Sequence, residues 1–84
     1  MSLLVVKFLT RPGCHLCDQA RPIVTSVAAR AGVEIEEIDI DSHPDLTRDF
    51  GLRIPVVLAP DGRVLAEGEI EARRFRKELR RRVD

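Results

Sequence analysis

The apolar residues of the chain fall into short unbroken runs and helical spacings. The first run, Leu3–Leu9, contains two adjacent valines and ends at a Thr-Arg-Pro-Gly segment, which predicts a strand buried on both faces. From about His15 to Ala31, apolar side chains recur every three or four residues and Gly32 follows, which predicts a helix with a glycine at its end. Pro22 interrupts this pattern, so it either kinks the helix or marks its first turn.

The second half of the chain predicts two more helices and three strands. Residues Val33–Ile40 predict a strand, although the alternation slips between Ile35 and Ile38 and leaves the register open. The segment "PDLTRDFG" predicts a short helix beginning at Pro44, and "IPVVLAPDGRVLAEG" predicts two strands joined by a turn at Pro60–Arg63. The C-terminal segment has helical spacing, with arginines on one face and these apolar residues on the other: Ala72, Phe75, Leu79 and Val83.

The predicted order is strand, helix, strand, helix, strand, strand, helix. The first three elements form a right-handed crossover with parallel strands, and the hairpin adds two antiparallel strands. We therefore predict an α/β fold with a four-stranded mixed sheet flanked by helices. The 84 residues contain no linker or repeat, and this length suits one domain over residues 1–84.

Charge and composition limit the kinds of partner. Fourteen basic and fourteen acidic residues cancel, so no overall field attracts nucleic acid or an anionic membrane. The arginine-rich segment Glu71–Asp84 is expected to be a solvated helix face, since the chain has no Trp or Tyr for base stacking. No apolar run approaches the roughly 20 residues of a membrane span, and the start does not resemble a signal peptide. We expect a soluble, cytoplasmic monomer that binds neither nucleic acid nor membrane.

The two cysteines, Cys14 and Cys17, lie in the segment "TRPGCHLCDQARP", between the first predicted strand and the first predicted helix. In a reducing cytosol this spacing is more often catalytic or metal-binding than structural. Closing a ring of about four residues would stabilise the fold by only about 2 kcal/mol. A C-x-x-C pair at a strand-to-helix boundary is typical of a thioredoxin-like redox site.

The placement predicts different roles for the two thiols. Free N–H groups and the helix dipole favour a thiolate at Cys14, and Arg11 or a protonated His15 would add positive charge beside it. His15 also fits a solvated loop position with no such role. Cys17, one turn further along, is expected to be more buried. The predicted reaction is thiol–disulfide exchange with Cys14 as nucleophile and Cys17 as resolving thiol.

Other uses of the cysteines fit the sequence less well. A c-type haem site needs a histidine after C-x-x-C, and Asp18 occupies that position. A structural zinc ion needs four ligands, and His15 lies inside the short cysteine loop, where tetrahedral ligation is cramped. His43 is expected to be a cap or loop residue. We therefore expect no bound metal.

Three segments resemble glutaredoxins, within the thioredoxin-fold superfamily. "TRPGCHLC" is similar to the basic-Pro-x-C-P-Y-C pattern, "RIPVV" resembles T-V-P with its following strand, and "EGEIEARRF" lies where glutaredoxins carry G-G. The C-H-L-C motif with "DIDSHPDL" and "FGLRIPV" is more similar still to a group of small bacterial glutaredoxin-like proteins. The resemblance implies the β-α-β-α-β-β-α thioredoxin-like fold and a dithiol oxidoreductase without a bound cofactor. It favours a first helix that begins at Cys14 and is kinked at Pro22.

The resemblance also implies roles outside the cysteine segment. Pro55 would be a cis-proline facing the cysteines, and the backbone of Ile54 would pair with an extended substrate segment. Arg53 and Gly68 would occupy the adjoining substrate-binding positions.

Three positions depart from the glutaredoxin pattern. Leu16 replaces a tyrosine, Arg53 a threonine, and Glu67 the first glycine of G-G. Glu67 would repel the carboxylates of glutathione, whereas Arg53, Arg11 and Arg48 would attract them. The sequence therefore leaves glutathione open as a co-substrate.

Three functions follow from these patterns. The first, which we expect, is exchange with a disulfide-containing protein or a glutathione mixed disulfide, with glutathione or a reductase as the reducing system. The second is a glutathione-assisted iron–sulfur cluster carrier, in which Cys14 ligates a cluster that bridges two chains. The third is a redox-silent binding module that uses the groove near Pro55 for peptides.

Overall fold

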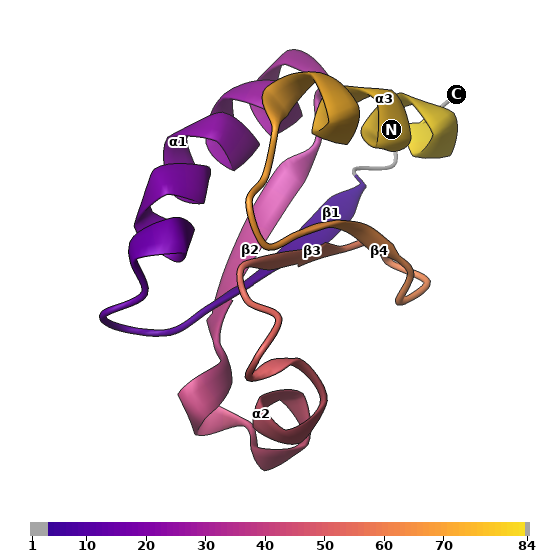
Figure 1. The fold of residues 1–84 in the computed structure, drawn as a ribbon. Coiled ribbons are helices and arrows are strands. Elements are labelled where there is room, and N and C mark those ends of the chain that lie inside the picture. Colours follow the sequence, from indigo (N-terminus) through magenta and orange to yellow (C-terminus); the bar gives the residue numbers. More distant parts are fainter. Residues whose placement is uncertain (1–3, 84) are drawn as a thin grey trace.

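Four strands form one mixed sheet in a computed structural model that describes residues 4–83. The strand order is β2–β1–β3–β4 (Figure 1). The first strand, β1 (Val5–Thr10), lies parallel to β2 (Glu34–Asp39) and antiparallel to β3 (Val56–Leu58). The edge strand β4 (Val64–Glu67) pairs antiparallel with β3. The predicted sheet is confirmed.

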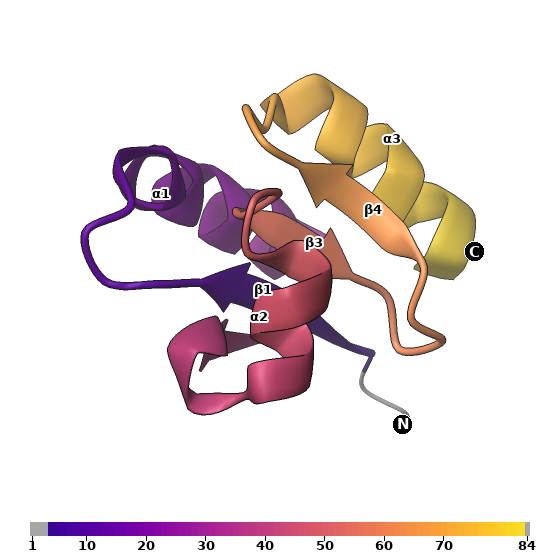
Figure 2. The same ribbon diagram turned by 60° about the horizontal axis from the view of Figure 1, so that its bottom comes forward.

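The helices cover both faces of this sheet (Figures 1 and 2). The long helix α1 (His15–Arg30) and the C-terminal helix α3 (Ala72–Val83) pack on one face, and α2 (Pro44–Phe50) packs on the other. A short 3-10 turn, η1 (Ile40–Ser42), precedes α2 and is the only described element that the sequence pattern did not predict. Among residues 4–83 no helix is long and apolar enough to cross a membrane.

The helix α1 runs through its proline. It begins directly after Cys14, its N-cap residue, and contains Pro22 as its eighth residue. The alternative that Pro22 marks the first turn is therefore wrong, and a helix that starts at the cysteines is confirmed. The kink at Pro22 stays a prediction.

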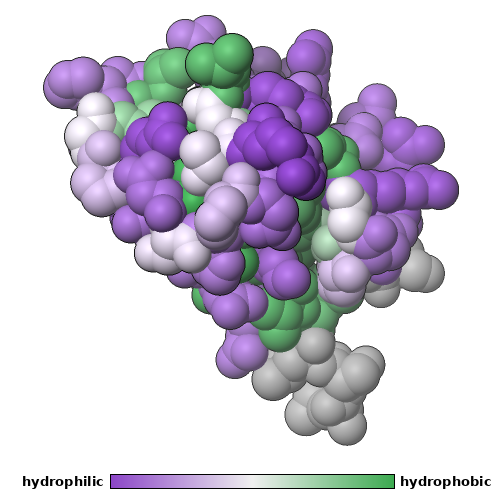
Figure 3. Space-filling model, turned by 90° about the horizontal axis from the view of Figure 1, so that it is seen from below, coloured by the Kyte–Doolittle hydropathy of each residue, from purple (hydrophilic) through white to green (hydrophobic). Residues whose placement is uncertain are grey.

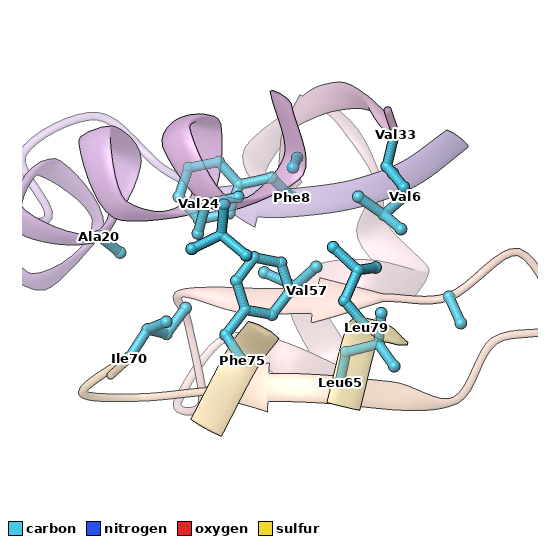
Figure 4. Close-up of a cluster of buried hydrophobic side chains, with 13 residues drawn as sticks. Val6, Phe8, Ala20, Val24, Val33, Val57, Leu65, Ile70, Phe75 and Leu79 are labelled. Atoms are coloured by element: carbon cyan, nitrogen blue, oxygen red, sulfur yellow. The ribbon is translucent and has the colours of Figure 1, made fainter. Parts of the chain in front are cut away.

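The larger core lies between the sheet and the helices α1 and α3 (Figure 4). Phe8 of β1 and Val57 of β3 meet Val24 of α1 and the side chains Phe75 and Leu79 of α3, and none of the five is more than 1% exposed. Fully burying such a side chain stabilises a fold by roughly 1.5–3 kcal/mol. This layer holds α1, and with it the cysteine pair, against the sheet.

The core face of α3 is shorter than its spacing predicts. Ala72, predicted to be buried, is exposed because it is the first residue of the helix, and Ile70 just before it enters the core instead. The side chain of Val83 lies outside the part of the chain that can be described.

The opposite face of the sheet is only half covered. Leu9 and Val56 are fully buried against α2, but α2 has seven residues and reaches only the end of the sheet at which β1 stops. Val5 and Lys7 are exposed near the other end, so burial on both faces is wrong for the first half of β1. Leu3 lies outside the described residues. Seen from below, hydrophobic surface shows between hydrophilic groups on this face (Figure 3).

The slipped alternation in β2 has a packing cause. Ile35 lies opposite Val6 and packs into the larger core, whereas Ile38 lies opposite Leu9 and packs into the smaller one. Because successive side chains of a strand point to opposite faces, two isoleucines three residues apart serve both cores in a single register.

The predicted turn between the last two strands is confirmed. The Ala59 N–H donates to the Arg63 carbonyl at 2.8 Å, and the Gly62 N–H donates to the Ala59 carbonyl at 2.9 Å. Gly62 has φ +91°, a conformation that a residue with a Cβ adopts only at a cost.

A polar network ties α1 to the sheet behind the cysteine loop. The Arg21 guanidinium donates to both Glu37 carboxylate oxygens at 3.0 and 2.8 Å and to Asp18 at 3.0 Å. The hydroxyl of the buried Thr10 donates to Glu37 at 3.0 Å. Arg21 holds the pKa of the Glu37 carboxyl below its usual range, with a smaller contribution from Thr10. The sequence pattern missed this network, since Arg21 and Glu37 meet only once the parallel strands are paired.

Replacing the central carboxylate should give a pH-dependent loss of stability. We expect Glu37→Gln to lower the free energy of unfolding by about 0.5–1 kcal/mol at pH 7, since the pair is partly exposed. Because folding lowers the pKa of Glu37, its contribution is present above the unfolded value of about 4.3 and is lost as pH falls through the folded value.

Urea unfolding at pH 7 and pH 3 measures this difference. The matched control is Glu34→Gln, an exposed position at the far end of β2. A Glu37→Gln deficit that is as large at pH 3 as at pH 7 contradicts the electrostatic role.

Candidate functional site

Three loops meet at one end of the sheet. The cysteine loop follows the end of β1, and Leu9 near that end lies opposite Val56, the first residue of β3. Val56 in turn lies opposite Glu67 at the end of β4. The second loop, which contains Pro55, precedes β3, and the third loop, which begins at Gly68, follows β4. The Gly68 N–H donates to the Pro55 carbonyl at 2.8 Å and joins these two loops. In Figure 1 these loops lie at the left-hand end of the sheet.

The two cysteines form a disulfide within the first turn of α1. Their Cα atoms are 5.2 Å apart, and the Cys14 sulfur also accepts the Cys17 N–H at 3.1 Å. Cys17 is fully buried and Cys14 is half-buried. The predicted difference in burial is confirmed, and Cys14 is the sulfur that a second molecule can reach more easily.

The local sequence explains why α1 begins at this point. Gly13 has φ +80° and redirects the chain after β1. Cys14 has extended backbone angles and is the N-cap residue, and its carbonyl accepts the Asp18 N–H at 3.1 Å as the first helical bond. An acidic residue in the first turn also suits the helix dipole.

Of the two basic residues predicted beside Cys14, Arg11 is paired with a carboxylate and His15 is exposed. Arg11 donates two hydrogen bonds to one Asp41 oxygen, at 3.0 and 2.8 Å, so a carboxylate offsets its positive charge. His15 is the exposed first residue of α1. The influence of either residue on the Cys14 thiol stays a prediction. Sequence reasoning missed Asp41, whose contact with Arg11 spans 30 residues.

The Ile54–Pro55 peptide bond is cis, as the resemblance implies. Pro55 is buried and Ile54 is half-buried. The Ile54 N–H already donates to the Phe50 carbonyl at 3.1 Å. An extended substrate would therefore meet only the carbonyl of Ile54 unless this bond opens, and the docking role of Ile54 stays a prediction.

The remaining arginines near the site are also paired with acids. The Arg53 guanidinium donates to Glu67 at 2.8 Å, and Arg48 donates to Asp49 at 3.0 Å. Asp49 raises the pKa of Arg48. Of the three arginines expected to offset Glu67, Arg53 pairs with it directly, whereas Arg11 and Arg48 are paired with other carboxylates.

A groove of about 720 Å³ adjoins the third loop, between α1, β4 and α3. Ile23, Leu65, Ile70 and Phe75 contribute its apolar lining, while Glu67, Glu69, Glu71 and Arg74 contribute the charged lining. Sequence reasoning missed the groove and two of its glutamates. The alternation in "EGEIE" is visible in the sequence, but only the packing of α3 beside α1 shows what these residues surround.

The described residues hold no cluster that suggests a metal site. Within residues 4–83, no group of three or more His, Cys, Asp or Glu side chains lies close enough together to hold an ion. His43 is the N-cap residue of α2, without a side-chain capping bond.

Comparison with known proteins identifies relatives over nearly the whole chain. Residues 5–82 match the family model described as Glutaredoxin-like domain (DUF836). Uncharacterised proteins of Mycobacterium tuberculosis and Mycobacterium bovis are each 34% identical over 86 residues, covering 96% of this chain and 88% of the relative.

Solved structures agree with this relationship. The crystal structure of a structural-genomics target protein from X. campestris is 34% identical, with a TM-score of 0.75, and the match covers 90% of this chain and 96% of that one. A mutant thioredoxin from Halobacterium salinarum is 22% identical with a TM-score of 0.72, over 96% of this chain and 75% of that one, and shows the shared fold. The chain therefore belongs to the Glutaredoxin-like domain (DUF836) family and has the fold of thioredoxin.

Proposed function

We propose that the protein is a thiol–disulfide oxidoreductase in which Cys14 and Cys17 alternate between dithiol and disulfide. The observation that carries the proposal is the N-cap position of Cys14, whose sulfur is half-buried and accepts the N–H of the fully buried Cys17. In the dithiol state this N–H and the positive end of the α1 dipole favour a thiolate at Cys14 over the thiol. The thiolate is the nucleophilic form.

The first step forms a mixed disulfide. The Cys14 thiolate attacks one sulfur of the substrate disulfide, a new S–S bond forms, and the other substrate sulfur leaves as a thiolate that takes a proton from solvent. The exposed side chain of Leu16, 40% exposed next to the pair, offers an apolar contact to the attacking complex.

The second step releases the reduced substrate. Cys17, deprotonated as the new bond forms, attacks the Cys14 sulfur and displaces the second substrate thiolate. The substrate disulfide has then gained two electrons and two protons, and the protein holds the Cys14–Cys17 disulfide. Two reducing thiols, from two glutathione molecules or from a reductase dithiol, must return two electrons and two protons before the next turnover. We propose a disulfide-containing protein or peptide as the substrate.

Alkylation of the reduced protein should distinguish the two thiols. We expect Cys14 to react quickly with iodoacetamide, with an apparent pKa below about 7, and Cys17 to react slowly because it is buried. Mass spectrometry of peptides alkylated across a pH series measures both rates. The role assignment is wrong if both cysteines titrate near 8.5 or react equally fast.

Single substitutions should separate the two steps. Cys14→Ser should abolish reduction of hydroxyethyl disulfide, whereas Cys17→Ser should complete the first step and retain the mercaptoethanol adduct on Cys14. Intact-mass spectrometry detects the adduct, and unfolding curves of both variants check that the fold is intact. An adduct that forms on Cys17 of Cys14→Ser as fast as on Cys14 of Cys17→Ser would overturn the assignment.

A further inference from the structure

Three glutamates, which we call the acidic rim, border the loop between β4 and α3. Glu67, Glu69 and Glu71 occupy alternate positions on either side of Gly68, and all three are exposed. They line the mouth of the groove between α1, β4 and α3, to which Arg74 contributes the one basic side chain. With Arg53, which pairs with Glu67, the three carboxylates have two guanidinium groups beside them, so the rim carries one negative charge more than positive.

The rim lies within reach of a molecule bound at Cys14. The end of β4 is separated from β1 by the single strand β3, and adjacent strands are about 4.8 Å apart, so the rim lies about 10 Å across the sheet from the start of the cysteine loop. The bond between Gly68 and Pro55 keeps the rim beside the loop that adjoins the cysteines. A substrate that extends from Cys14 over Pro55 therefore brings its neighbouring groups towards Glu67.

Arg53, the cation that pairs with Glu67, is held in place. Arg53 donates to Glu67 at 2.8 Å, and its guanidinium carbon lies 5.0 Å from the centroid of the Phe50 ring. Stacking on an aromatic ring adds to the ion pair, so Arg53 is bound on two sides. An anionic substrate group would have to displace a carboxylate to bind Arg53, whereas a cationic group would meet Glu69. Glu71 lies beside Arg73, Arg74 and Lys77, which oppose its charge.

Coulomb's law shows that these charges suffice for selection. Two unit charges about 10 Å apart change a rate or binding constant roughly 2-fold at the dielectric constant of water, and roughly 15-fold at an effective value near 20. Because the effect has opposite signs for anions and cations, the ratio of the two rates changes by the square of such a factor.

We propose that this rim makes the site prefer disulfides that carry positive charge beside the reacting sulfur, and that Glu67 is the specificity-determining residue. The substrate class is a disulfide flanked by lysine or arginine. Glutathione, with its carboxylates, is disfavoured. This inference rests on the proposed exchange reaction and specifies its substrate.

Three small disulfides of different charge test the proposal. Reduced protein is mixed with excess cystamine (cationic), hydroxyethyl disulfide (neutral) or dithiodipropionate (anionic), and the rate of Cys14–Cys17 disulfide formation is measured by acid quench and mass spectrometry. Each rate is divided by that of free mercaptoethanol with the same disulfide, because leaving groups differ in reactivity. We expect cystamine to exceed dithiodipropionate at about 10 mM salt, and the ratio to shrink at 1 M, where charges are screened.

Two variants with opposite expected effects test whether Glu67 determines the charge preference. Glu67→Gln leaves Arg53 unneutralised and should lower the cystamine-to-dithiodipropionate ratio by about 4-fold or more, with the neutral disulfide changed least. Arg53→Gln leaves the glutamates unopposed and should raise the ratio. Glu34→Gln is the matched control, since it removes the same charge at the far end of β2 and should leave all three rates unchanged.

The outcomes separate this inference from the reaction on which it rests. Fast exchange with no charge preference, or a ratio that Glu67→Gln changes no more than Glu34→Gln does, overturns the inference alone. Equal shifts in the same direction from Glu67→Gln and Arg53→Gln also overturn it. A wild-type protein that reduces none of the three disulfides overturns the proposed reaction, and the inference fails with it.

Discussion

The position at which α1 begins is the constraint on which the site depends. Cys14 is the N-cap residue, so its sulfur accepts the N–H of Cys17 and stands at the positive end of the helix dipole. If α1 began about two turns later, at Pro22, the cysteines would lie in a loop without this contact. The glycine turn at Gly13 and the first helical bond from Asp18 fix the start, and the buried face of α1 fixes its distance from the sheet.

Two kinds of interaction keep that start in place. Burial of apolar side chains between the sheet and α1 supplies most of the free energy, but it is not directional. The bonds from Arg21 to Glu37, and from Thr10 to Glu37, are directional and join α1, β2 and the end of β1 at one carboxylate. The network lies directly behind the cysteine loop, where a shift of α1 would move both sulfurs relative to the end of the sheet.

The sequence predicted the elements and the cysteine pair because both depend on local patterns. Strand runs, helical spacings and the C-x-x-C motif each extend over about twenty residues or fewer. The local pattern was ambiguous at Pro22 and in β2, and there the sequence left the helix start and the strand register open. The pairing of Arg11 with Asp41 and of Arg53 with Glu67 could not be predicted, because contacts across 30 and 14 residues depend on the finished sheet. The sequence therefore identified the three arginines near the site but not the carboxylates with which they pair.

Charge is also distributed unevenly over a chain whose net charge is zero. The acidic rim precedes α3, and the Glu71 carbonyl accepts the first helical bond from Phe75 at 3.0 Å, so Glu71 stands at the positive end of that helix dipole. Arg80, Arg81 and Arg82 stand in its last turn, at the negative end. Both placements stabilise α3 by the same electrostatic effect. The helix dipole therefore accounts for Glu71, but not for the pairing of Arg53 with Glu67. That pairing occupies the Arg53 guanidinium beside the Pro55 loop, and the proposed substrate preference rests on it.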